Sequence, residues 1–192
     1  RLDCVVPVMH GMHGEVGSLQ GLLEMCNLPF TSSGVAASAV GMDKVYMKQF
    51  FVGGGFPVLP SCWYLRTSWE ADADAVLDGV EKQLPYPVFV KPASLGSSIG
   101  VSKAKNREEL RHALELAFEF DRKVLVEQGL ENPLELNCSV LGYGEEANPS
   151  EIEMPVTGGD LLSFMDKYIQ GNASTKGMAS LKRILPAPIE PE

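Results

Sequence analysis

The sequence lacks the long apolar runs, paired cysteines and excess of basic residues that mark several large classes of protein. No run approaches the ~18–20 consecutive apolar residues of a membrane-spanning helix. The formal net charge is −9, which argues against duplex nucleic acid or an anionic membrane as the main partner. An anionic small ligand is still compatible with this charge, because a local cluster of lysines can bind it.

The cysteines are few and scattered. The 4 cysteines form no C-x-x-C pair, so we expect neither a disulfide scaffold nor a zinc site, and a reducing cytosol is the expected compartment. The sequence begins without Met and without a signal-peptide pattern. It opens on an apolar run and stops on Ile189-Glu-Pro-Glu192, so we expect it to be part of a longer protein.

The hydrophobic patterning predicts a mixture of helices and strands in a chain of 192 residues, of which 45% are hydrophobic. A Val-rich run over 4–9 predicts a strand buried on both faces of a parallel sheet. A glycine-rich loop and a helix over 18–26, with Ser18 as N-cap, follow it. Further helices are expected over 35–52, 71–83 and 108–120, and further strands over 62–66, 88–92, 100–103, 123–127, 134–141 and 151–156. A long loop is expected over 158–182, and the fold class is α/β and α+β.

The stretch from Phe89 to Val101 carries the strongest chemical signal. A strand delivers Lys91, and a loop with Gly96, Ser97 and Ser98 then turns back into a second strand. Small residues let backbone N–H groups approach an anion, and the lysine supplies charge. The loop is not a Walker A motif, because its lysine precedes the glycines. A hairpin with a glycine-rich turn explains the same residues equally well.

Other charged residues have two interpretations each. Lys44 begins a helix and offers a second phosphate ligand, although a lysine in this position is more often solvated. Glu127 ends a buried strand, where ligands bind in many α/β proteins. Glu135 alternates with leucines, so it is also compatible with the solvated face of a strand.

Together these residues form an ordered set of motifs that covers nearly the whole chain. The motifs include His10-Gly-x-x-Gly-Glu15, Gln20-Gly-Leu-Leu-Glu24, Ser33-Gly-Val-x-Ala-Ser38, Met42-Asp-Lys44, Val90-Lys-Pro-x-x-x-Gly-Ser-Ser-x-Gly100 and Asp166-Lys-Tyr168. Each motif is weak alone, but the set in this order is specific. The sequence resembles the D-alanine–D-alanine ligases and their D-alanine–D-serine and D-alanine–D-lactate relatives, which belong to the ATP-grasp superfamily.

The resemblance implies how ATP is held. Two lysines would bind the phosphates, and the glycine-rich loop would close over them. The residues implied for the phosphates are Lys44, Lys91, Gly96, Ser97 and Ser98.

The rest of the nucleotide would be contacted by residues further along the chain. The resemblance implies that Glu127 and the backbone of Leu130 contact adenine and that Glu135 contacts the ribose.

The resemblance also implies residues for the substrates and for closure of the site. Lys167 would contact the γ-phosphate, and Tyr168 with Ser97 would lock a mobile loop over the substrates. His10 and Glu15 would face the first D-alanine. Val16 stands where the family has Asp, so the loop has one carboxylate fewer.

The implied activity is that of an ATP-dependent carboxylate–amine ligase. ATP phosphorylates the carboxylate of one D-alanine, and the amine of a second attacks the acylphosphate to give D-alanyl-D-alanine for peptidoglycan synthesis. Closure excludes water, which would hydrolyse the acylphosphate. The implied cofactors are ATP and Mg²⁺ or Mn²⁺, with no nucleic acid or membrane partner, in a homodimer of the bacterial cytoplasm. The family's metal ligands are expected beyond Glu192, so we expect this chain alone to lack ligase turnover.

The implied architecture is an ATP-grasp fold that is incomplete at both ends. A remnant of the N-terminal α/β domain would span 1–32, the central ATP-grasp domain 33–126, and the first part of the C-terminal ATP-grasp domain 127–192. Two alternatives stay open: a D-alanine–D-serine or D-alanine–D-lactate ligase, and a nucleotide-binding fragment without catalysis.

Overall fold

The computed structural model describes residues 2–131, 133–156 and 183–189. Contacts within the chain divide it into two compact units, Arg1–Gly129 and Leu130–Glu192. The division into three domains stays a prediction.

The first unit is built on a four-stranded antiparallel sheet with the strand order β1-β4-β2-β3. Val126 of β4 lies opposite Cys62 on one neighbouring strand and opposite Val90 on the other. The hairpin predicted around the glycine-rich loop is confirmed, because β2 and β3 pair directly. The strands are β1 (Ser61–Leu65), β2 (Val88–Pro92), β3 (Ser102–Ala104) and β4 (Lys123–Gln128).

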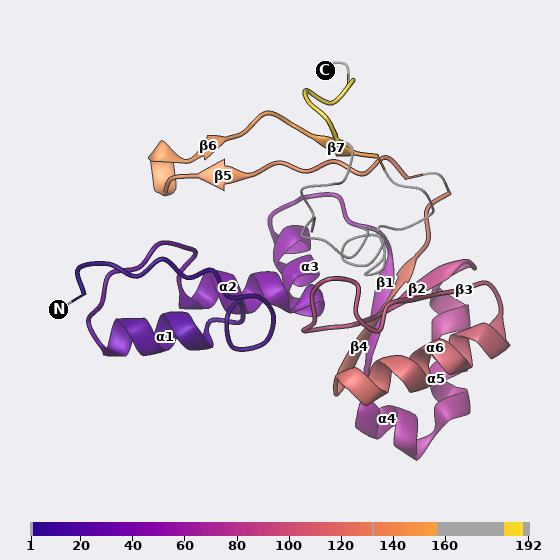
Figure 1. Ribbon diagram of the computed structural model, residues 1–192. Helices are drawn as coiled ribbons and strands as arrows, with labels where there is room; N and C mark the ends of the chain where they lie inside the picture. Colours follow the sequence, from indigo (N-terminus) through magenta and orange to yellow (C-terminus); the bar gives the residue numbers. More distant parts are fainter. Residues whose placement is uncertain (1, 132, 157–182, 190–192) are drawn as a thin grey trace, which may run out of the picture. The chain divides into compact units, whose positions relative to one another are not determined.

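Two helices cover one face of this sheet (Figure 1). They are α5 (Ala73–Gln83) and α6 (Arg107–Phe120), and a short helix, α4 (Arg66–Ala71), that the sequence pattern did not predict precedes them. Alternate residues of the strands point into this core, because successive side chains of a strand face opposite sides. Buried members of the core include Leu77, Val80, Val88, Val90, Leu110, Leu114, Val124 and Val126. We call this side of the sheet the helix-covered face.

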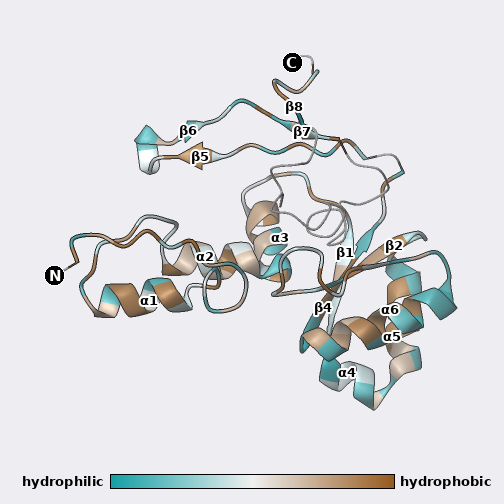
Figure 2. Ribbon diagram, viewed as in Figure 1, coloured by the Kyte–Doolittle hydropathy of each residue, from teal (hydrophilic) through white to brown (hydrophobic). Residues whose placement is uncertain are grey.

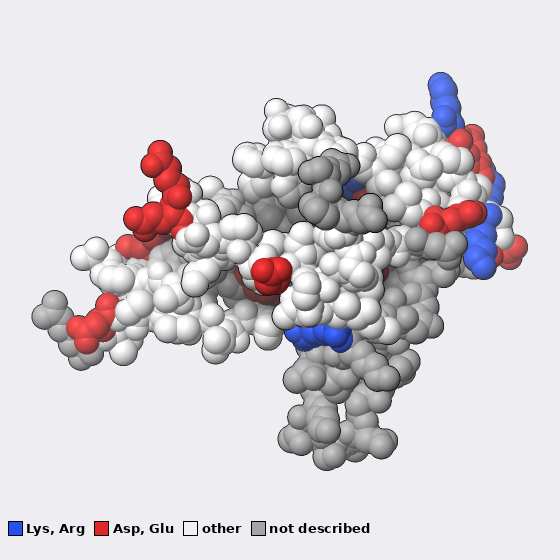
Figure 3. All heavy atoms as spheres, turned by 90° about the horizontal axis from the view of Figure 1, so that it is seen from above, with Lys and Arg blue, Asp and Glu red and all other residues white. Residues whose placement is uncertain are grey.

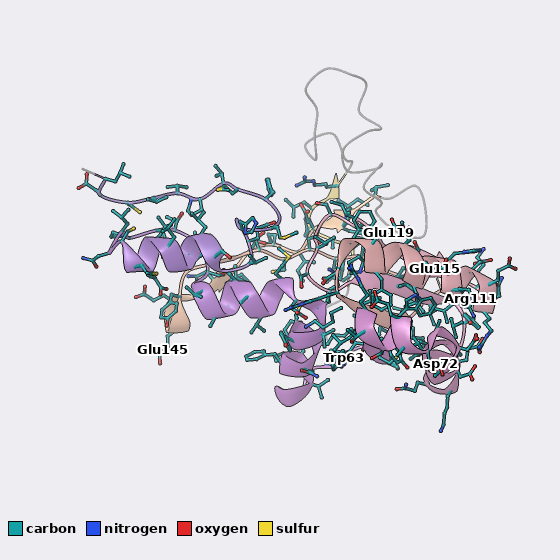
Figure 4. All side chains as sticks on the ribbon, turned by 90° about the horizontal axis from the view of Figure 1, so that it is seen from below. Trp63, Asp72, Arg111, Glu115, Glu119 and Glu145 are labelled. Carbon is teal, nitrogen blue, oxygen red and sulfur yellow. The ribbon has the colours of Figure 1, made fainter. Side chains whose placement is uncertain are left out.

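Helix α6 shows why its sequence folds as it does. Asn106 caps the first turn, since its side chain accepts a hydrogen bond from the Glu109 N–H at 2.9 Å, and acidic residues there favour the helix dipole. Apolar residues recur at helical spacing and form a stripe that Figure 2 shows in brown beside teal. On the solvent side, Arg111, Glu115 and Glu119 follow one another along the helix (Figure 4).

The helical region predicted over 35–52 is two helices. They are α2 (Val35–Met42) and α3 (Lys44–Gly53). Asp43 separates them with an extended backbone, and its side chain accepts hydrogen bonds from the backbone N–H groups of Val45 and Tyr46. The break follows from this cap, because a carboxylate at an N-cap stabilises the start of a new helix. Helix α3 packs on the other side of the sheet, where Val45 joins Ala93 and Leu125 in a small buried cluster.

The prediction that the Val-rich run over 4–9 forms a strand buried on both faces of a parallel sheet is wrong. Val5 makes one isolated bridge, to Phe30, and Val8 is 82% exposed. An apolar run is buried in a sheet only when strands pair on both sides, and the described residues supply only this bridge.

The helix after the glycine-rich loop is confirmed as α1 (Ser18–Met25). Its N-cap is Gly17 rather than Ser18. Gly17 has a φ of +89°, and a side chain there would lie 2.8 Å from the Val35 carbonyl oxygen, so this position favours glycine.

The second unit contains short paired segments. Its elements are β5 (Val140–Leu141), the 3₁₀ turn η1 (Gly144–Glu146), β6 (Asn148–Pro149), β7 (Met154–Pro155) and β8 (Arg183–Ile184). The strand predicted over 134–141 therefore forms only at its end, with one isolated bridge from Asn137 to Glu153. The strand predicted over 151–156 shortens to β7, which pairs with β8, while Glu153 before it makes the isolated bridge to Asn137. The loop predicted over 158–182 lies outside the described residues.

Among the helices that the structure describes, not one combines the length and the apolar character that a membrane-spanning helix requires.

Candidate functional site

The face of the sheet opposite α5 and α6 carries charged side chains, and we call it the charged face. Lys91 of β2 and Glu127 of β4 alternate with core residues and therefore point to this side. Helix α3 adds Lys44 and Lys48, which are one helical turn apart and lie on the same side of the helix. The sequence placed Lys44, Lys91 and Glu127 in one site, and the structure brings these three together.

Glu127 is bound by two lysines. The Lys48 Nζ lies 2.5 Å from Oε1 of Glu127, and the Lys91 Nζ binds Oε2. The Glu127 side chain is 11% exposed, Lys48 12% and Lys91 22%. The pairing neutralises a carboxylate that would be costly to bury alone.

Burial raises the pKa of the Glu127 carboxyl, but the charges of Lys91 and Lys48 outweigh burial and hold this pKa below its ordinary value. The Lys44 amine shows the opposite balance. Burial and the nearby Lys91 lower the pKa of Lys44, against the opposing charges of Asp121, Asp43 and Glu127. An anion that binds beside Lys44 therefore relieves an unfavourable charge, because it favours the protonated lysine.

Lys44 also joins α3 to the segment after β2. Its Nζ donates to the carbonyl oxygen of Pro92 at 3.2 Å and to that of Leu95, and its backbone N–H donates to the Ala93 carbonyl oxygen at 2.9 Å. The glycine-rich loop consequently begins directly beside the ammonium group of a half-buried lysine.

The loop from Gly96 to Gly100 turns through left-handed backbone conformations. Ser97 has a φ of 54°, Ser98 of 59° and Gly100 of 68°. Two backbone hydrogen bonds close it, from Ile99 to Gly96 at 3.2 Å and from Val101 to Ser98 at 3.3 Å. Non-glycine residues in this region of backbone space are uncommon, and such strained positions cluster at active sites and ligand clamps.

A second ion pair fixes the start of α3. Asp43 lies 2.5 Å from the Lys123 Nζ, and that Nζ lies 3.8 Å from the centre of the Tyr46 ring. Asp121 holds the segment after β2, because its carboxylate accepts from the backbone N–H of Ser94 at 2.8 Å.

Sequence reasoning missed Lys48 and the supporting residues Asp43, Asp121 and Lys123. For Lys48 a signal was present, because it follows Lys44 by four residues in a segment that was already predicted to be helical. The long-range pairs carry no comparable signal, because their partners lie far apart in the sequence.

The other residues that the sequence predicted for the site belong to other parts of the chain. His10 and Glu15 meet each other before α1, with 4.0 Å between the His10 Nδ1 and the Glu15 carboxylate. Glu15 also lines a cavity of about 390 Å³ together with Gln20, Ser33 and Ser38.

Leu130 is 48% exposed and Glu135 is half-buried, and both belong to the second unit. Lys167 and Tyr168 lie outside the described residues.

A metal site was expected outside this chain. In the part of the chain that the structure describes, no group of three or more His, Cys, Asp or Glu side chains is placed to hold a metal ion. The position of the metal ligands therefore stays a prediction.

A comparison with family models assigns the chain. The model described as D-ala D-ala ligase C-terminus matches residues 50–189. The chain belongs to this family. The family's ATP-grasp fold, predicted from the motifs, is confirmed by this match and by solved structures of D-alanine ligases.

Relatives with curated names include the D-alanine–D-alanine ligase of Bacillus velezensis, which is 46% identical over 172 residues, or 89% of this chain. That of Acetivibrio thermocellus is 41% identical over 181 residues, or 94% of this chain. This chain covers 48% of each of them. It therefore spans about half the length of the curated relatives that it matches.

Two solved structures are similar over nearly the whole chain. The VanG D-Ala:D-Ser ligase from Enterococcus faecalis has a TM-score of 0.80 and 34% identity, over 98% of this chain and 51% of that one. The D-alanyl-alanine synthetase A from Vibrio cholerae has a TM-score of 0.79 and 28% identity, over 99% of this chain and 54% of that one.

Proposed function

We propose that this family member takes part in the ATP-dependent ligation of D-alanine to D-alanine through an acylphosphate. The observation that carries the proposal is the charged face, where Lys44 and Lys91 lie beside the glycine-rich loop. Charge spreads over the phosphate oxygens during phosphoryl transfer, so lysines held at such a face stabilise it. The names of the curated relatives support this reaction.

The roles that we propose for the nucleotide-binding residues are those that the resemblance to the family implies. Lys44 and Lys91 bind ATP phosphates, and the loop that holds Gly96, Ser97 and Ser98 covers them. Glu127, at the end of β4, accepts a hydrogen bond from the adenine amine. Leu130 and Glu135 contribute contacts to adenine and ribose.

The reaction itself has two steps. An oxygen of the first D-alanine's carboxylate attacks the γ-phosphorus and ADP leaves. The amine of the second D-alanine then attacks the acyl carbon, loses a proton, and expels inorganic phosphate as the peptide bond forms. His10 and Glu15 face the first D-alanine, while Lys167, Tyr168 and Ser97 act at the γ-phosphate and in closure.

The identity of the second substrate is a proposal of its own. Relatives at 41–46% identity are named D-alanine–D-alanine ligases, whereas the D-Ala:D-Ser ligase is 34% identical. The names of the curated relatives favour D-alanine, whereas identity to the solved structures does not separate the two activities, because the D-alanyl-alanine synthetase A from Vibrio cholerae is 28% identical. Divalent metal, a cytoplasmic location and a homodimer remain expectations from the family.

Lys91→Ala tests the nucleotide site. We expect the affinity for ATP, measured by calorimetric titration of the chain, to fall by at least about tenfold, because a phosphate loses a charge-assisted partner. Lys82→Ala, at an exposed lysine of α5, is the control and should leave the affinity unchanged. A loss smaller than a few-fold for Lys91→Ala contradicts the assignment.

A thermal-shift experiment tests the ligase proposal more broadly. The melting temperature is measured with Mg-ATP, with and without D-alanine, and with D-serine as a parallel arm. Stabilisation by ATP and further stabilisation by D-alanine support the proposal. Stabilisation by neither contradicts it, and ATP alone favours a nucleotide-binding role without ligation.

A further inference from the structure

Lys48 is held by two groups at once. Its Nζ donates to the carbonyl oxygen of Leu59 at 2.8 Å and lies 2.5 Å from Oε1 of Glu127. One of these partners belongs to the backbone, so Lys48 is anchored independently of the carboxylate. At 12% exposed, it is shielded from solvent that would weaken the ion pair.

Lys91 binds the same carboxylate in a different manner. It takes the other oxygen, Oε2, and its ammonium lies 5.9 Å from the centre of the Phe89 ring. Its side chain is more exposed than that of Lys48, at 22% against 12%. Glu127 therefore has one firmly anchored lysine and one that is better placed to turn toward a ligand.

We propose that Lys48 is a positioning residue for nucleotide recognition. It remains on Oε1 and keeps Glu127 ionised and oriented, while Lys91 leaves Oε2 for a phosphate and Oε2 then accepts a hydrogen bond from an exocyclic amine of the base. This inference rests on the proposed nucleotide site and adds to it a residue that acts through Glu127.

The energetic reason lies in the burial of Glu127. If Lys91 left a carboxylate that had no second lysine, a charge that is 11% exposed would be unpaired, and such a charge is strongly unfavourable. Lys48 removes this penalty. Binding of the phosphates and recognition of the base are thereby coupled through one carboxylate.

Comparison of ATP with ITP tests the role, because ITP carries a carbonyl where adenine has its amine. We expect the wild-type chain to bind ATP about tenfold more tightly than ITP, the effect of one hydrogen bond to a charged group. In Lys48→Met this preference should fall to about twofold or less, while Lys48→Arg, which keeps both the charge and the donors, should retain most of it.

Lys123→Met is the matched control. Lys123 is also 12% exposed and lies 2.5 Å from its carboxylate partner, Asp43, so its loss reproduces the removal of a buried ion pair. Because this pair fixes the start of α3, its loss is expected to lower the affinity for both nucleotides alike, and the ATP-to-ITP ratio should be unchanged. If Lys48→Met does not fold, Lys48→Gln provides the same measurement.

A double-mutant cycle with Glu127→Gln distinguishes action through Glu127 from direct contact with the nucleotide. Lys48→Met should change ATP affinity less than twofold in the Glu127→Gln background, because coupled residues are not additive. Full additivity, or an unchanged preference in folded Lys48→Met, overturns the inference and leaves the nucleotide site intact. A wild-type chain that binds neither nucleotide overturns the proposed function and this inference with it.

Discussion

The two faces of the four-stranded sheet are built from alternate residues of the same strands, and they differ in almost every property. Along β4, Val124 and Val126 enter the core under α5 and α6, whereas Glu127 turns to the lysines of the charged face. One residue of register separates Val126, whose side chain is buried in the core, from Glu127, whose carboxylate binds the lysines of the charged face.

Ion pairs also differ between regions of the first unit. On the outer surface of α5 and α6, Arg107 pairs with Asp74, Asp78 and Glu81, whose side chains are 32–71% exposed. Figure 3 shows acidic and basic side chains intermixed on the side of the view where these helices lie. Such pairs contribute little because water screens them, while the pair of Lys48 with Glu127 is shielded. The exposure of the ion pairs to solvent, more than their number, distinguishes the outer surface of these helices from the candidate site.

The largest loss of stability is expected from a substitution on the helix-covered face. Leu114→Ala removes a side chain that is 0% exposed in the core, and a cavity of this kind costs about 2–5 kcal/mol of unfolding free energy. Urea denaturation measures the loss. Leu116→Ala on the same helix is the control, because Leu116 is 42% exposed, and it should change stability by no more than about 0.5 kcal/mol. Equal losses for both leucines would contradict the burial of the Leu114 side of α6 against the sheet.

The contrast between the faces also explains what the sequence could predict. Most of the strands and helices of the first unit were predictable, because their apolar residues recur with a period that a sheet or a helix imposes. The sharing of Glu127 by two lysines was not predictable, because it depends on a register between β2 and β4, which are more than 30 residues apart. The prediction of a buried strand over 4–9 was wrong because a Val-rich run does not reveal whether partner strands are present.

Glu127→Gln, on the charged face, is expected to cause an intermediate loss of stability. It leaves Lys48 and Lys91 without their carboxylate, so we expect a loss of about 1–3 kcal/mol of unfolding free energy at pH 7. The pKa of Glu127 is lowered in the folded chain, so its contribution to stability is present above the unfolded pKa and is lost as pH falls through the folded one.

Urea unfolding at several pH values checks this sign. The wild-type and Glu127→Gln curves should differ most near pH 7 and converge in acid, because a protonated glutamate resembles glutamine in charge. A difference that stays constant down to low pH would show that the stability comes from packing rather than from the ionised carboxylate.

The smallest effect on stability is expected in the loop that connects β2 to β3. It starts at Leu95, whose carbonyl oxygen accepts from Lys44, and ends at Gly100, where an added side-chain carbon would lie 2.8 Å from both Phe120 and Pro92. Gly100→Ala should cost about 1–2 kcal/mol, because its φ of +68° also disfavours alanine. Gly96→Ala meets no atom within 4 Å and should leave the melting temperature unchanged or slightly raised. If the two substitutions had the same effect on the melting temperature, the end of the loop would not be packed against Phe120 and Pro92.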